Sequence, residues 1–153
     1  MKALNFIVAL LLCAQAYGQV MDLDTLLEID SKNAFLKTVI ENGYSQAANQ
    51  REGFLVYEFE YPAGKIGAYY SLLTTDVEWG FLYPKYTMAF NIIVAAIKER
   101  CRFETIYKFT EKQTFSCYSC PKAKASGFIG FTNDQAPSIV YFSRSVIENL
   151  EDN

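Results

Sequence analysis

The sequence predicts an α+β fold in which one or two helices pack on an antiparallel sheet, with a small antiparallel β-barrel as the alternative. Three observations indicate this fold class. An early segment repeats apolar residues at helical spacing, two later pairs of segments alternate apolar and polar residues around short turns, and an apolar stretch separates those pairs. Alternating segments joined by short turns form antiparallel hairpins, and helices pack on one face of such a sheet.

Residues 1–18 have the three parts of a secretory signal peptide. Lys2 supplies a positive charge, Phe6–Cys13 supply an apolar run, and two small-x-small sites follow it. The run is about half as long as the roughly 20 apolar residues that a membrane-spanning helix needs. We expect cleavage after Gly18, which leaves residues 19–153 as a single secreted globular domain with no membrane anchor.

Residues 22–42 are predicted to be helical. Their apolar residues recur near helical spacing, Asp22 or Asp24 can cap the start, and Gly43 is placed for a C-terminal cap. Ser31 is compatible with a break into two shorter helices, because serine also caps helix starts.

After a polar connection over residues 44–53, the pattern changes to that of strands. Residues 55–61 place aliphatic and aromatic side chains on one side and two glutamates on the other. A turn is expected at 62–65, and 66–75 is predicted to return as the second strand of a hairpin. Residues 79–83 are interpreted as an aromatic connection or a short strand.

Residues 85–99 are apolar on nearly every face and are predicted to form a buried helix, although their β-branched residues also fit a strand. Residues 103–109 alternate as a strand with one solvated face, and 114–118 are predicted to return beside them. The remaining expected elements are two short strands and a short final helix, over residues 128–131, over 138–142 and from Ser145 onward.

The composition excludes several classes of function. The chain has no histidine, the commonest general base near neutral pH and the commonest metal ligand. This rules out histidine-dependent catalytic triads and histidine-ligated zinc sites. Without Lys2, the exported chain carries 13 basic and 17 acidic side chains, a formal net charge of −4. We therefore expect no cofactor, no nucleic-acid partner and no attachment to anionic membranes.

Three cysteines remain after the signal peptide is removed. Cys101 is expected to bridge to Cys117 or Cys120, because both flank predicted neighbouring strands. The odd number leaves one thiol that is either free or joins two chains into a disulfide-linked dimer. Cys117 and Cys120 also form a CxxC motif, so a secreted thiol-redox protein is an alternative. Against it, the helix that could follow Pro121 is short and has no apolar face.

Aromatic residues are the candidates for a ligand site. Tyrosines and a tryptophan at this density line pockets for apolar ligands, and they also fill the cores of small sheet proteins. The candidates for ligand binding are Tyr69, Tyr70, Trp79, Tyr83 and Tyr86.

The sequence therefore predicts a secreted, non-enzymatic binding protein whose partner is another protein or a small apolar ligand. The first alternative is a secreted hydrolase that uses two carboxylates facing each other across a cleft. The carboxylates available for such a pair are Glu58 with Glu60, on one face of a strand, and Asp76 with Glu78, near Trp79.

Overall fold

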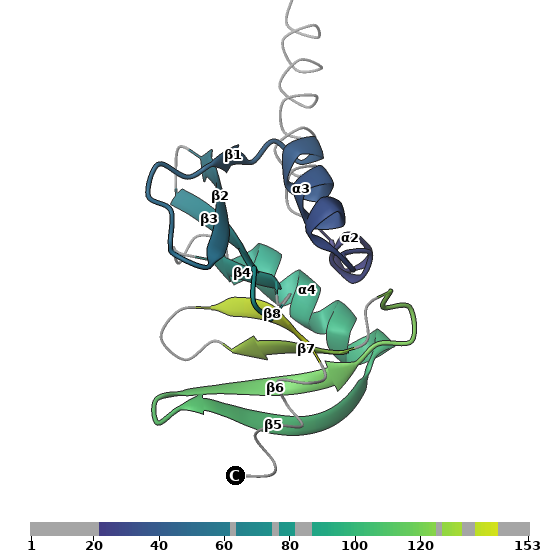
Figure 1. The fold of residues 1–153 in the computed structure, drawn as a ribbon. Helices are drawn as coiled ribbons and strands as arrows, with labels where there is room; N and C mark the ends of the chain where they lie inside the picture. Colours follow the sequence, from purple (N-terminus) through teal and green to yellow (C-terminus); the bar gives the residue numbers. More distant parts are fainter. Residues whose placement is uncertain are drawn as a thin grey trace, which may run out of the picture.

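The computed structural model describes residues 22–61, 64–74, 77–81, 87–124, 127–132 and 137–143. The expected signal peptide, Asp76, Tyr83, Tyr86 and the expected final helix from Ser145 lie outside these ranges. In chain order, the elements are α2 (Leu23–Leu27), α3 (Lys32–Glu41), β1 (Ser45–Gln46), β2 (Phe54–Tyr61), β3 (Gly64–Ser71), β4 (Val77–Phe81), α4 (Thr87–Arg100), β5 (Arg102–Thr110), β6 (Gln113–Ser119), β7 (Gly127–Thr132) and β8 (Ser138–Ser143) (Figure 1).

The described strands form one antiparallel sheet in the order β1-β2-β3-β4-β8-β7-β6-β5. The last strand, β8, joins the two hairpin regions, because Val77 of β4 pairs with Tyr141 and Gly127 of β7 pairs with Ser143. The sheet is open, with β1 and β5 at its two ends. The α+β prediction is therefore confirmed, and the sheet does not close into the barrel that was the alternative.

The predicted helix over 22–42 is divided at Ser31. The Asp22 carboxylate accepts a hydrogen bond from the Thr25 N–H at 2.8 Å and caps α2. Ser31 Oγ accepts a hydrogen bond from the Ala34 N–H at 3.2 Å and caps α3. Gly43 follows α3 with a φ of +79°, a conformation that glycine adopts without strain. Both the break and the glycine stop match the sequence prediction.

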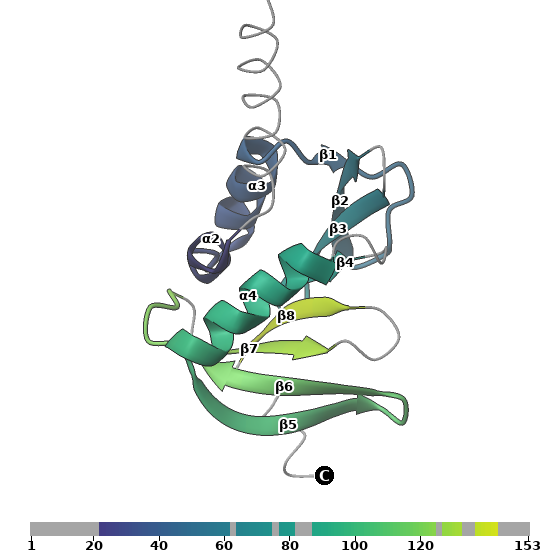
Figure 2. The same ribbon diagram turned by 180° about the vertical axis from the view of Figure 1, so that it is seen from behind.

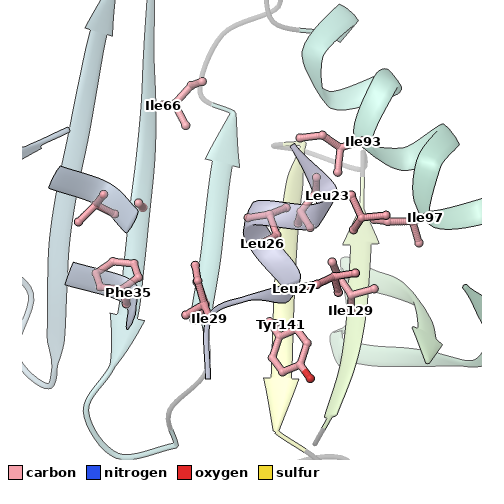
Figure 3. Close-up of a cluster of buried hydrophobic side chains, with 14 of the residues drawn as sticks. Leu23, Leu26, Leu27, Ile29, Phe35, Ile66, Ile93, Ile97, Ile129 and Tyr141 are labelled. Atoms are coloured by element: carbon pink, nitrogen blue, oxygen red, sulfur yellow. The ribbon is translucent and has the colours of Figure 1, made fainter. Parts of the chain in front are cut away.

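The core lies between the helices and one face of the sheet. Leu23, Leu26 and Leu27 of α2 meet residues of the sheet and of α4, as Figure 3 shows. The buried residues of α4 recur every three or four positions, which confirms the predicted buried helix and leaves Ile92 on its exposed side. They are Phe90, Ile93, Val94 and Ile97.

Three predicted boundaries change. The expected connection over 44–53 contains β1, in which Ser45 pairs with Glu58. The strand β3 begins at Gly64 and ends at Ser71, because the chain turns there: Ser71 Oγ accepts a hydrogen bond from the Thr74 N–H at 3.2 Å. The aromatic segment predicted over 79–83 as a connection or a short strand is a strand, β4, and it begins earlier, at Val77.

None of α2, α3 and α4, the helices within the described ranges, combines the length and the apolar character that crossing a lipid bilayer requires.

Candidate functional site: the edge strand β5

The strand β5 is at the end of the sheet and pairs only with β6 among the described strands. Its sequence is rich in β-branched and aromatic residues, which favour strands, and Glu111 and Lys112 turn the chain into β6. The pairing is regular over residues 105–108. Irregularities in register, between Phe103 and Thr105 and between Lys108 and Thr110, flank this stretch.

Three large apolar side chains of β5 are exposed. The exposed fractions are 50% for Phe103, 65% for Ile106 and 56% for Phe109. The prediction of one solvated and one covered face for residues 103–109 is therefore wrong. The reason is position: α4 lies across β7 and β8, and β5 is at the far edge of the sheet (Figure 2).

The neighbours on β6 explain which of these side chains is most exposed. The Phe103 ring packs edge-on against Tyr118, with ring centroids 5.4 Å apart, and Phe109 packs edge-on against Phe115 at 6.2 Å. Ile106 is opposite Ser116, whose small polar side chain offers little apolar surface. Ile106 is thus the most exposed of the three.

Ion pairs lie on both sides of Ile106. The Arg102 guanidinium donates to Glu104 Oε1 at 2.7 Å, and Lys108 Nζ donates to Glu111 Oε2 at 2.9 Å. Three of the four side chains are mostly exposed and Glu104 is 26% exposed, so each pair contributes only about 0–1 kcal/mol to stability. Ile106 is therefore flanked on each side by an ion pair without net charge.

At the other end of the sheet, backbone groups of β2 already have hydrogen-bond partners. The short strand β1 pairs with the middle of β2. Beyond it, the Gln50 side-chain amide donates to the Val56 C=O at 3.2 Å and accepts from the Val56 N–H at 3.3 Å. A side chain thus occupies backbone groups of β2 that an added strand would need.

The cysteine pairing that the sequence left open is Cys101 with Cys120. Cys117 is fully buried, and burial raises the pKa of its thiol to about 11. The pair Cys117 and Cys120 therefore lacks the exposed, low-pKa dithiol that the redox hypothesis requires. Burial also keeps the Cys117 thiol from a second chain, which argues against the expected disulfide-linked dimer.

The candidate aromatic residues do not converge on one described pocket. Tyr69 and Tyr70 are neighbours on β3, so their side chains lie on opposite faces of the sheet. Tyr70 is buried in the core, where its ring centroid is 5.3 Å from that of Phe35. The Tyr69 ring lies over Gly67, where a Cβ would come within 2.6 Å of the Tyr69 hydroxyl oxygen. Trp79 is in register with Ala68.

The main group of described carboxylates lines a cavity of about 430 Å³ beside α2 and α3. Asp24 accepts hydrogen bonds from Arg100, and this interaction lowers the pKa of the Asp24 carboxyl. Glu28 pairs with Lys124 at 2.8 Å. A hydrolase needs one carboxyl that stays protonated, hence a raised pKa, and Asp24 has the opposite shift. Of the residues predicted for the hydrolase, Glu58 is paired with Lys65.

Within the described ranges, no group of three or more histidine, cysteine, aspartate or glutamate residues is placed to hold a metal ion.

One feature of the sequence distinguishes β5 from a strand with a single solvated face. The even-numbered positions over 102–108 hold three charged residues, Arg102, Glu104 and Lys108, and one apolar residue, Ile106. This apolar residue departs from the alternation expected of a strand with one solvated face.

No protein-family model, curated protein or solved structure matches this chain.

Proposed function

We propose that this chain is a secreted, non-enzymatic binding protein that contacts a partner protein through β5. One observation carries the proposal: β5 combines a sheet edge with a single strand neighbour among the described residues and three exposed apolar side chains. Such an edge offers backbone donors and acceptors to an added strand, and its side chains supply apolar contact area.

A protein partner fits this surface better than a small apolar ligand. Ligand pockets are concave and enclose most of the ligand, whereas Phe103, Ile106 and Phe109 follow one another along an extended strand. A second extended chain can pair with the open edge of such a strand and contact the side chains along it.

Secretion is supported by two features that are far apart in the sequence. Residues 1–18 have the order of a cleavable signal peptide. The disulfide between Cys101 and Cys120 is of a kind that persists in oxidising compartments and is rare in the cytosol.

A photo-crosslinker at position 106 tests the proposed function. The side chain is p-benzoylphenylalanine, incorporated in place of Ile106 in the exported protein and irradiated in the medium of the exporting cells. We expect a discrete protein adduct, because the partner covers Ile106. The matched control has the same substitution at Ile40, which is 62% exposed on α3 and lies outside β5.

The masses of the adducts decide the outcome. A discrete adduct at 106 that is missing at 40 supports binding through β5. Equal adduct patterns at both positions, or none at 106, would mean that β5 is not a binding surface.

A further inference from the structure

We propose that Asn42 is a site of spontaneous deamidation, and that the cap at the C-terminal end of α3 holds this reaction back until the cap opens. Asn42 follows the last residue of α3 and precedes Gly43. Asparagine reacts fastest before glycine, because glycine has no side chain to hinder ring closure. None of the other asparagines of the chain is followed by glycine. This chemistry is separate from the role of β5.

The reaction needs only water and the atoms of these two residues. The backbone nitrogen of Gly43 loses its proton to hydroxide and attacks Cγ of Asn42, and Cγ releases the side-chain nitrogen as ammonia. Water then opens the five-membered succinimide that results. Opening at the side-chain carbonyl gives aspartate, and opening at the main-chain carbonyl gives isoaspartate. The net change is the replacement of ammonia by water.

The cap engages both reacting groups in hydrogen bonds. Asn42 Nδ2 donates to the Thr38 C=O at 2.8 Å, which holds the carboxamide against the preceding turn of the helix. The Gly43 N–H donates to the Ile40 C=O at 3.0 Å, so the proton that must leave is bound. Ring closure therefore requires that both hydrogen bonds break.

A buried side chain keeps the cap closed. The Tyr44 N–H donates to the Val39 C=O at 2.9 Å, which completes the hydrogen-bond pattern of a Schellman motif. Tyr44 is 5% exposed, and its ring centroid is 5.6 Å from that of Phe59 on β2. Opening the cap breaks the Tyr44 hydrogen bond and disturbs this packing. We therefore expect the open form to be rare in the folded chain.

The cap requires the same residue that makes Asn42 reactive. Gly43 has a φ of +79°, a region that residues with a side chain rarely adopt, so another residue there would strain the cap. Glycine at this position also leaves ring closure unhindered. The fold thus keeps a labile pair of residues and protects it by hydrogen bonding.

Deamidation would weaken the cap that restrains it. Aspartate at position 42 has no Nδ2 to donate to Thr38. Its negative charge is at the C-terminal end of α3, where the helix dipole disfavours an anion. Isoaspartate adds a methylene group to the main chain and changes the spacing of the hydrogen bonds in the cap. The modified helix end is therefore open for a larger fraction of the time.

Peptide mapping of the full chain by mass spectrometry measures the reaction at Asn42. The protein is incubated in mildly alkaline buffer, either folded or unfolded in guanidinium chloride, and is then digested with trypsin. Cleavage after Lys37 and Arg51 yields one peptide that also contains Asn49, an exposed asparagine followed by glutamine. We expect Asn42 to react at least about tenfold more slowly in the folded chain than in the unfolded chain. In the unfolded chain, Asn42 should react faster than Asn49.

Two variants test the role of the cap. Tyr44→Ala removes the packing against Phe59 and should raise the rate at Asn42 in the folded chain at least about tenfold, relative to the rate in the same variant when unfolded. Ser45→Ala changes an exposed residue of β1 and should leave this ratio as in the native chain. If Tyr44→Ala is unfolded by circular dichroism, Phe59→Leu replaces it, because it loosens the same contact and keeps an apolar side chain.

Slow conversion in the folded chain, together with acceleration in the folded Tyr44→Ala variant, supports the inference. Equal rates at Asn42 in the folded and unfolded chains would overturn the protective role of the cap, and so would an unchanged ratio in the folded variant. An unfolded chain in which Asn42 reacts no faster than Asn49 would overturn the site itself.

Discussion

Replacing Phe35 with alanine should lower the free energy of unfolding by about 3–5 kcal/mol. Phe35 has no exposed surface, and its ring connects α3 to two strands. It packs edge-on against Tyr57 of β2, with ring centroids 6.0 Å apart, and against Tyr70 of β3 at 5.3 Å. Its truncation removes these contacts and leaves a cavity that a close-packed core fills only in part. Equilibrium unfolding in urea measures the loss.

The control for this prediction is on the same helix. Ile40→Ala removes an apolar side chain of similar chemistry that is mostly exposed, so the loss should be within about 0.5 kcal/mol. Equal losses for the two variants would contradict the placement of Phe35 between α3 and the sheet.

Removal of the disulfide should lower the free energy of unfolding by about 3 kcal/mol. The double variant Cys101→Ser/Cys120→Ser opens a loop with a sequence separation of 19 residues, between the end of α4 and the end of β6. In the chain-entropy model, the bridge stabilises the fold because it restricts the unfolded chain. Guanidinium chloride unfolding of the double variant and of the native chain gives the difference.

A reducing agent supplies the matched comparison. Dithiothreitol should destabilise the native chain to about the same extent and leave the double variant unchanged, since Cys117 is a thiol in both. A double variant as stable as the oxidised native chain would show that the bridge does not stabilise this fold.

Local patterns were sufficient to predict most of the helices and hairpins. The break at Ser31 and the stop at Gly43 follow from capping chemistry that single residues specify. The alternation in β2 and β6 follows from one face that is buried in each hairpin. These features depend on neighbours within a few residues, which a sequence displays directly.

The order of the strands depends on contacts between distant residues. Ser138–Ser143 form β8, which lies between β4 and β7 and unites the two halves of the sheet. Nothing in the alternation of this segment specifies which strands flank it. The short strand β1 was missed for a similar reason, because two polar residues pair with β2 without an apolar pattern of their own.

In the candidate site, too, some features follow from local patterns and others depend on contacts between distant residues. Tyr69 and Tyr70 are adjacent in the sequence, yet period-two geometry separates them onto opposite faces. The choice of Cys120 over Cys117 depends on where β6 ends, since Cys117 is inside the strand and points into a buried cluster. Ile106 is exposed because α4 does not extend over this edge of the sheet. That is a tertiary feature, which the residues next to Ile106 in the sequence do not specify.

The central claim, that β5 is a binding surface for a partner protein, is tested most directly by photo-crosslinking at position 106, the most exposed apolar side chain of β5. A second control places the same crosslinker at Ile92, an apolar residue that is 59% exposed on α4. We expect a discrete protein adduct at position 106, seen by intact mass, and none at position 92. Equal adduct patterns at the two positions, or none at 106, would contradict the claim.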